Sequence, residues 1–527
     1  MTFAGTGRLL RFFLHTDRVR LAAWVLGVIA LVGFTAVSVK GLYPTQADLE
    51  AAAAPLYDNA AVIALNGPTY GIDTLGGQIV FQVGSFGYVV MALMGMFLVG
   101  RHTRADEEEG RTELLRATVV GRTAPVTAVL VVATAAFALL GVLIALSVLS
   151  TGVPAAGSWL YGAAMAGFGL LFACVTAVTV QVSSHNRAAL GLAGAVLGAA
   201  YVLRAIGDIG SGTLSWLSPM GWAQAARPFA GDAWWTLGLL AAGCVALVAV
   251  AFVLLGIRDL GGGLVPPRPG PADASRALTT PVGLAVRLQR AALIGWVAGL
   301  VLTGVAYGSV GNDVADLVGD NQSMEDIIAQ AGGNLTDSFF STALLTIALI
   351  AGGYAISSAL RLRSEETSGR LEPVLATAVS RTRWAASHTA LALVGSALAM
   401  LATGLATGIT YALVAGDGGQ VARLTGAALA FVPALWVLVG VAVALFGLAP
   451  RAVGVAWGAL VVCLVIGLFG EIFDLPTWVR DVSPFQHVPQ MPAAGFSLLP
   501  TALLLLVAGA LLVAGFAGFR RRDAGAA

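Results

Sequence analysis

A fourteen-residue motif occurs twice in this chain, and this repeat constrains the fold more than any other feature. Residues 110–123 read GRTELLRATVVGRT, and residues 369–382 read GRLEPVLATAVSRT. Eight of the fourteen positions are identical without a gap, at a spacing of 259 residues in a chain of 527. A repeat over so long a spacing indicates that one structural unit has been duplicated. The sequence therefore predicts two equivalent halves, each with the same charged loop.

Hydrophobic residues make up 58% of the chain and charged residues only 11%, whereas a soluble domain has about 25% charged residues. This composition predicts a membrane protein without a large soluble domain. Lipid offers no hydrogen-bond partners to the backbone, so only helices or closed barrels cross it. Since the apolar runs are long, we expect an all-α polytopic fold. One lysine against 28 arginines, with abundant glycine and alanine, favours a bacterial source and hence the bacterial plasma membrane.

Twelve apolar runs are long enough to cross a bilayer, which requires about 20 residues per helix. The N-terminal run is too long for a signal peptide, so we interpret it as an uncleaved first span. The expected spans are 21–43, 79–100, 123–150, 158–181, 188–207 and 233–257 in the first half, and 291–310, 338–360, 384–415, 421–448, 452–473 and 497–519 in the second.

The distribution of basic residues predicts the orientation of these spans. With the N-terminus inside the cell, 24 of the 29 Lys and Arg residues fall on the cytoplasmic side, as the positive-inside rule requires. The C-terminus is then also inside. Six spans per half is an even number, so both halves have the same orientation and form a parallel repeat.

The expected organisation is a first six-span repeat over 1–260, a Gly/Pro-rich cytoplasmic linker over 261–281 and a second six-span repeat over 282–527. A short basic and apolar segment precedes each first span, at 5–20 and 283–290, and is typical of a helix lying in the membrane interface. Short helices are also expected where Ser-Pro steps precede the sixth and twelfth spans, at Ser218 and Ser483.

Motifs of ATP-binding and hydrolytic enzymes are absent from the sequence. The only lysine, Lys40, does not lie in a phosphate-binding loop, and there is no metalloprotease motif or nucleophile elbow. The three cysteines and five histidines do not have metal-ligand spacing. We therefore expect neither an enzyme nor a bound metal or cofactor, and nothing indicates a nucleic-acid partner.

Ion-driven carriers place ionisable side chains within their spans. Here the exceptions lie near span ends: Lys40, Arg204, Arg423 and Glu471. This weakens an ion-coupled mechanism and directs attention to the duplicated loops, 101–122 and 361–383. Each has acidic residues, a Gly-Arg step and a short amphipathic stretch. A solvated loop accounts for the arginines, but not for the matching Glu113 and Glu372, which favour a soluble partner.

This pattern of acidic residues, Gly-Arg, Glu, Ala-Thr and Arg-Thr resembles the coupling-helix loop of ABC type-2 exporter permeases. The double-length form is similar to actinobacterial permeases of polyketide-antibiotic (tetronasin-type) exporters. The resemblance implies a separate cytoplasmic ATPase subunit, in two copies, that holds ATP and Mg and contacts both loops. The implied coupling residues are Asp106, Glu107, Glu108, Gly110, Arg111 and Glu113 in the first loop, and Glu365, Glu366, Gly369, Arg370 and Glu372 in the second.

In that family the substrate passes between the second and fifth spans of each unit. On this chain the resemblance implies a hydrophobic small molecule near Phe81, Gln82, Phe86 and Tyr88 in the first half, and Phe339, Phe340, Thr346 and Tyr354 in the second. Ordinary helix packing is the alternative for each of these residues. At the level of function, the alternatives are an ion-coupled twelve-span drug carrier and an exporter of lipid or cell-envelope components.

Overall fold

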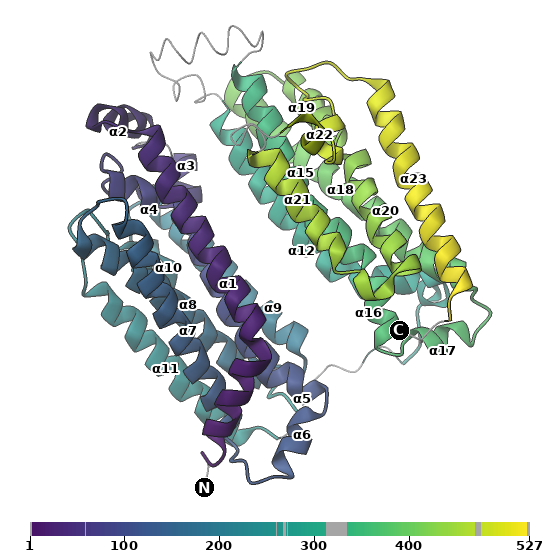
Figure 1. Ribbon diagram of the computed structural model, residues 1–527, viewed down its shortest axis with the longest axis horizontal. Helices are drawn as coiled ribbons and strands as arrows, with labels where there is room; N and C mark the ends of the chain where they lie inside the picture. The colour runs from purple at the N-terminus through teal and green to yellow at the C-terminus, as the bar shows by residue number, and fades with distance from the viewer. Residues whose placement is uncertain are drawn as a thin grey trace. The chain divides into compact units, whose positions relative to one another are not determined.

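The computed structural model describes residues 3–57, 60–259, 261–266, 270, 272–311, 335–469 and 476–523. Within this part the chain is helical, and its one β-bridge is an isolated parallel pair, Ser183 with Val265. The chain divides into two compact units, Met1–Gly270 and Pro271–Ala527. Each unit is a bundle of long helices with its own apolar core (Figure 1).

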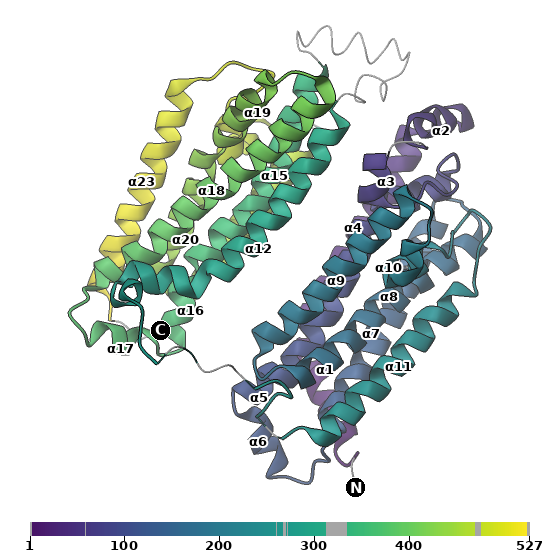
Figure 2. The same cartoon turned by 180° about the vertical axis from the view of Figure 1, so that it is seen from behind.

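The first unit is built around α8, which packs against α4, α7 and α11, while α1 packs against α7 (Figure 2). The N-terminus lies at the end of the bundle that also holds α5 and α6. The long helices are α1 (Thr6–Leu42), α4 (Leu75–Gly100), α7 (Ala124–Leu149), α8 (Ala155–Val182), α9 (Asn186–Ile209) and α11 (Thr236–Ile257). The short ones are α2 (Gln46–Ala53), η1 (Ala54–Leu56), α3 (Ala60–Asn66), η2 (Arg101–Ala105), α5 (Asp106–Glu108), α6 (Arg111–Arg116), η3 (Leu214–Leu217) and α10 (Pro219–Gln224).

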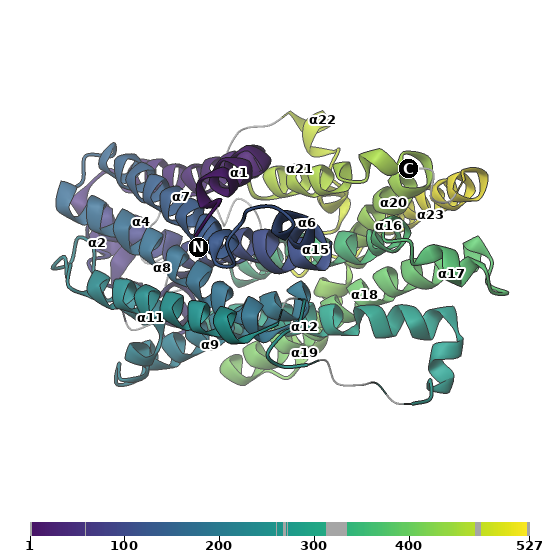
Figure 3. The ribbon, with the colours of Figure 1, turned by 90° about the horizontal axis from the view of Figure 1, so that it is seen from below.

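The second unit pairs α12 with α18 and α20 with α23, and α15 contacts both α18 and α20. Its C-terminal end lies beside α16 (Figure 3). The long helices are α12 (Pro281–Val310), α15 (Leu335–Ala359), α18 (Arg381–Ala415), α19 (Gly419–Leu429), α20 (Val432–Leu448), α21 (Val455–Phe469) and α23 (Leu498–Arg521). The short ones are η4 (Arg276–Thr279), α16 (Arg361–Thr367), α17 (Leu371–Leu375), η5 (Pro450–Ala452), α22 (Thr477–Arg480) and η6 (Pro484–His487).

The prediction of an all-α polytopic membrane protein is confirmed. Among the described residues, 11 helical segments are long and apolar enough to span a membrane. The predicted span 452–473 corresponds to the shorter apolar helix α21, and its last residues lie outside the described part, as do Glu471 and most of the loop 311–337. The count of twelve spans and their orientation stay predictions.

The segment expected to lie as a separate interfacial helix, 5–20, is continuous with the first span in α1. Residues 283–290 likewise belong to α12. Neither segment has a proline or a glycine pair at the junction to end the helix, so the backbone hydrogen bonds continue through it. The predicted span 421–448 lies within one segment, Gly419–Leu448, that is long and apolar enough to cross a membrane. Its helix has a short break, because α19 ends at Leu429 and α20 begins at Val432, with Pro433 in its first turn.

Short helices follow both Ser-Pro steps, as the sequence predicts: α10 after Ser218 and η6 after Ser483. The Ser218 Oγ caps α10 by accepting from the N–H of Met220, and it donates to the carbonyl of Ala200 on α9 at 2.6 Å. A cap of this kind satisfies an amide that the helix itself leaves unpaired.

Arg204 of α9 is fully buried, and its guanidinium holds the end of the short helix α3. It donates to the carbonyls of Ile63 and Ala64 at 2.9 and 2.8 Å, and the Tyr201 hydroxyl donates to Leu65 at 2.7 Å. Carbonyls at a helix C-terminus have no partners within the helix and favour a cation. Arg204 therefore fixes the segment between the first two long helices onto the bundle.

Candidate functional site

Each duplicated loop consists of two short helices joined by a glycine turn. In the first loop Gly110 lies between α5 and α6, with φ of 72°; in the second, Gly369 lies between α16 and α17, with φ of 69°. A Cβ atom is disfavoured at positive φ, which explains why both positions are glycine. The repeated Gly-Arg step therefore encodes the same left-handed turn in both units.

Glu107 of the first loop points into its unit rather than toward solvent, and its side chain is 7% exposed. Its carboxylate accepts two hydrogen bonds from Arg258, the residue after α11, at 3.1 and 2.9 Å. Arg104 donates to the same carboxylate at 2.9 Å, and the N–H of Gly261 donates at 2.8 Å. Because ionic hydrogen bonds of this two-pronged kind are strong and directional, Glu107 is committed to contacts within the chain.

Glu366 of the second loop makes the equivalent contact with Arg522, the residue after α23, at 2.7 and 2.8 Å. Its side chain is 2% exposed. Arg363 adds a hydrogen bond at 3.2 Å. The Arg522 guanidinium lies over the rings of Phe446 and Phe519, at 4.9 and 5.2 Å from the ring centres. Both units therefore join this loop to the end of their last long helix through a buried carboxylate and an arginine.

The far end of each loop returns to the same arginine. The Arg122 guanidinium donates to the backbone carbonyl of Arg258 at 2.5 Å, and that of Arg381 donates to the carbonyl of Arg522 at 2.8 Å. We call each set of three residues a loop clamp: Glu107, Arg122 and Arg258 in the first unit, and Glu366, Arg381 and Arg522 in the second. Each clamp closes its loop at both ends onto the residue that follows the last long helix.

Sequence reasoning counted Arg258 and Arg522 only as charges on one side of the membrane. The signal that identifies them is their matching position, since each follows the last apolar run of its half. The repeated Arg-Thr step contains the third clamp residue, Arg122 or Arg381. The loop residues of a clamp lie far in sequence from the arginine after the last helix. Only the packing of the helices therefore shows that they are in contact.

The other predicted charged coupling residues near the turns also have partners within their own units. Arg111 pairs with Asp106 at 2.8 Å and with Glu109. Glu108 accepts from the N–H of Asn186 at the start of α9, at 2.7 Å. In the second loop Glu365 pairs with Arg361 at 2.5 Å and with Arg370 at 3.6 Å. These carboxylates position the loops more than they offer free charge.

Glu113 on α6 and Glu372 on α17 differ from the rest of the predicted set. Both are exposed, and neither makes a side-chain hydrogen bond or ion pair with any residue that the structure describes. They occupy the same position, three residues after the glycine of the turn. Each unit therefore presents one unpaired carboxylate on the short helix that its clamp encloses.

A buried ionic cluster near the first loop was not predicted. Asp17 of α1 is 3% exposed and pairs with His102, which is equally buried, and with Arg101 at 3.5 Å. The ring of Phe13 stacks on His102 at 4.1 Å. Sequence reasoning assigned Asp17 to a surface segment, whereas burial here ties α1 to the end of α4.

Four of the eight predicted substrate residues are buried within their own units. Tyr88 packs edge-on against Phe168 at 5.3 Å, and Tyr354 against Trp296 at 6.5 Å. Phe81 and Phe340 are 5% and 1% exposed. Of the others, Gln82 and Phe86 are exposed and Phe339 and Thr346 are half-buried. Phe86 borders a cavity of about 480 Å³ whose other lining residues are Arg20, Ala23, Trp24, Gly27, Val28, Leu31 and Val90.

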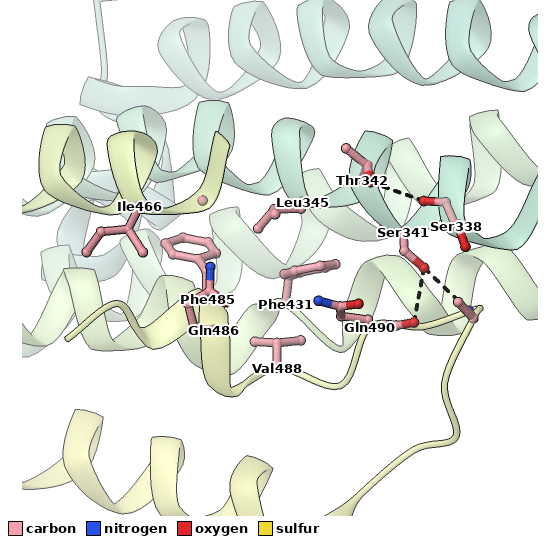
Figure 4. Close-up of a pocket in the computed structure, with 12 residues that line it drawn as sticks. Ser338, Ser341, Thr342, Leu345, Phe431, Ile466, Phe485, Gln486, Val488 and Gln490 are labelled. Atoms are coloured by element: carbon pink, nitrogen blue, oxygen red, sulfur yellow. Dashed lines mark hydrogen bonds between the residues drawn. The ribbon is translucent and has the colours of Figure 1, made fainter. Parts of the chain in front are cut away.

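A second cavity, of about 340 Å³, lies within the second unit between α15, α21 and the segment after η6 (Figure 4). Ser341 of α15 donates to the carbonyl of Gln490 at 3.0 Å and so fixes that segment against the helix. Leu345, Phe431 and Ile466 form its apolar side. Its lining does not include the four predicted substrate residues of α15, although that helix forms one side of the cavity: Phe339, Phe340, Thr346 and Tyr354.

Comparison with known proteins shows the family. The chain is 43% identical over 525 residues to the multidrug efflux system permease protein Rv1217c of Mycobacterium tuberculosis, covering 99% of this chain and 95% of that relative. This chain belongs to the Rv1217c family of multidrug efflux system permeases. Residues 278–520 also match the family described as the C-terminal domain of multidrug efflux system permease Rv1217c. As a member of this family, it is a multi-pass permease of the bacterial plasma membrane and not an enzyme.

Proposed function

We propose that this chain is the membrane-spanning subunit of an ABC type-2 exporter, which moves hydrophobic or amphipathic compounds, including drugs, out of the cell. A separate cytoplasmic ATPase, in two copies, binds ATP and Mg and supplies the energy. The relative named as a multidrug efflux system permease supports the efflux function. A system of this kind includes components besides the permease, and the ATPase is the component that we propose.

The observation that best supports an ATPase partner is the matched pair of short helices, each with a carboxylate that has no partner in the part of the chain that the structure describes. Glu113 and Glu372 are exposed at equivalent positions. Neighbouring loop carboxylates are instead paired with arginines of the same unit: Asp106 with Arg111, Glu107 with Arg258 and Glu366 with Arg522. Two equal contact points suit two copies of one soluble protein, because symmetric assemblies repeat the same interface. A preference of only a few kcal/mol for one of two conformations, supplied by ATP binding, is enough to switch the central cavity from inward-facing to outward-facing.

Co-purification of the tagged permease with the products of neighbouring genes tests this proposal. We expect an ATPase to be retained and its hydrolysis rate to rise when an exported compound is added. Transport in liposomes that contain the permease alone would contradict the proposal. Loss of efflux on collapse of the proton gradient, with ATP intact, would favour an ion-coupled carrier instead.

The alternative function is an exporter of the same kind that moves lipid or cell-envelope components instead of drugs. The relative is named a multidrug efflux system permease, and this name favours drugs over lipid as cargo. Stimulation of ATP hydrolysis by lipid but not by any drug would favour the lipid alternative.

A further inference from the structure

The loop clamps connect two parts of each unit that are far apart in sequence. Glu107 and Arg258 are 151 residues apart, and Glu366 and Arg522 are 156 residues apart. In both units the carboxylate precedes the exposed short helix and the loop arginine follows it. The short helix is therefore held between two attachments to one residue at the end of α11 or α23.

The contacts between the loop carboxylates and the terminal arginines are rigid. Two parallel N–H···O bonds between an arginine and a carboxylate fix the angle between the groups as well as their distance. Both carboxylates are more than nine-tenths buried. Water and salt therefore screen their attraction to the arginines only weakly. In the second unit the arginine is also held by two aromatic rings.

The first clamp includes a further connection. Arg104, with a 1% exposed side chain, donates to the carbonyls of Val180 and Gly262 at 2.7 and 3.0 Å. The segment after α11 also pairs with the end of α8, where the N–H of Val265 donates to the carbonyl of Val182 at 3.0 Å. Arg104, which also binds Glu107, and the segment after α11 therefore connect the first clamp to α8.

We infer that Arg258 and Arg522 are positioning residues that transfer movement of the duplicated loops to the last long helix of each unit. This inference rests on the proposed function, in which a partner acts on the loops. A push on α6 or α17 displaces both attachments together, and the bidentate pairs pass the displacement to α11 or α23. The loop and the last long helix of each unit therefore move together.

Double-mutant cycles in the assembled transporter test this inference. The variants are Glu366→Gln, Arg522→Gln and the two combined, with the matching set Glu107→Gln, Arg258→Gln and their combination. Coupling between sites typically corresponds to about 5- to 150-fold, so we expect each single variant to lower efflux per ATP hydrolysed at least about fivefold. Because the partners act as a unit, the combined variant is expected to be no worse than either single variant. The ATPase is expected to stay bound.

Arg423→Gln is the matched control. Arg423 pairs with Asp337 near the start of α15, whereas Glu366 lies on α16, which follows the other end of α15. The loss of Arg423 is expected to leave efflux per ATP within about twofold. Two outcomes would overturn the inference. One is that the effects of the Glu and Arg substitutions on efflux per ATP multiply in the combined variant; the other is full efflux in a combined variant that retains its ATPase.

Variants that fail to accumulate in the membrane are replaced by Arg258→Lys and Arg522→Lys. Lysine keeps the charge but loses the bidentate geometry, so we expect normal amounts with partly uncoupled hydrolysis. Unchanged coupling in both lysine variants would overturn the inference. Failure of the wild-type permease to retain any ATPase is a different result, because it contradicts the proposed function and not the contacts of the clamps.

Discussion

Gly110 and Gly369 have nearly the same backbone conformation, with φ of 72° and 69°, at positions 259 residues apart. Apart from the two neighbours in the chain, no atom of the described residues lies within 4 Å of the place where a Cβ would stand at either residue. A substitution there therefore changes the backbone preference and does not create a clash. We expect Gly110→Ala or Gly369→Ala to destabilise the turn by about 1 kcal/mol and to weaken ATPase binding.

Asparagine tolerates the left-handed region better than alanine. Gly110→Asn and Gly369→Asn are therefore the matched controls, with a smaller loss in thermal stability and in ATPase co-purification. Equal behaviour of alanine and asparagine would show that the turn conformation does not matter.

Charge reversal at the two exposed carboxylates tests the contact with the partner. We expect Glu113→Arg with Glu372→Arg to abolish efflux and ATPase stimulation, because two favourable contacts become repulsive. The amount of protein in the membrane is expected to stay normal, since neither side chain has a partner in the described part of the chain. Glu50→Arg, at an exposed position of α2, is the control. Normal efflux of a fluorescent amphipathic dye from the double variant would remove the coupling role.

Phe86 and Phe340 separate the two interpretations of the predicted substrate residues. Phe86 is 64% exposed and Phe340 is 1% exposed. We expect Phe86→Ala to change dye efflux without changing thermal stability. Phe340→Ala removes a packed ring beside Tyr411, at 4.7 Å between ring centres, and is expected to cost about 3 kcal/mol of stability. A stable Phe340→Ala variant with altered drug selectivity would instead place Phe340 in the substrate path.

Tyr354 packs so closely on α18 that Gly395 leaves no room for a side chain. A Cβ at Gly395 would lie 1.9 Å from the Tyr354 hydroxyl oxygen. We expect Gly395→Ala to lower the melting temperature, with overpacking costing about 1–3 kcal/mol. Adding Tyr354→Phe removes the clashing oxygen and is expected to restore part of the loss. Thermal unfolding in detergent measures both, and a double variant no more stable than Gly395→Ala would contradict this contact.

Arg204 is expected to hold α3 in place. Replacing it by alanine leaves the carbonyls of Ile63 and Ala64 without their donors, at a cost of about 1–3 kcal/mol for each unsatisfied group. We expect Arg204→Ala to increase cleavage by chymotrypsin at Leu65 and Tyr70 in purified protein. Arg187→Ala, at an exposed position near the start of the same helix, is the control. Equal cleavage rates in the two variants would show that α3 is held by other contacts.

Much of the architecture follows from the order of residues alone. Apolar runs of the length of a bilayer can satisfy their backbone only as helices, so the long helices follow from composition and length. The duplicated turns also follow, because Gly-Arg after a charged stretch is a local signal. The continuous helix α1 is different, since the end of an interfacial segment depends on surroundings that a basic and apolar sequence does not specify.

The candidate site divides in the same way. The sequence by itself identified both loops and the matching Glu113 and Glu372, because a repeat is visible without knowledge of contacts. Only the tertiary structure decided that Glu107 and Glu366 face inward to Arg258 and Arg522, and that Asp17 is buried against His102. An ionised side chain looks the same in a sequence whether it meets solvent or a partner 150 residues away. Helix packing makes that choice, because the cost of burying a charge is offset only where an opposite charge is held within hydrogen-bonding distance.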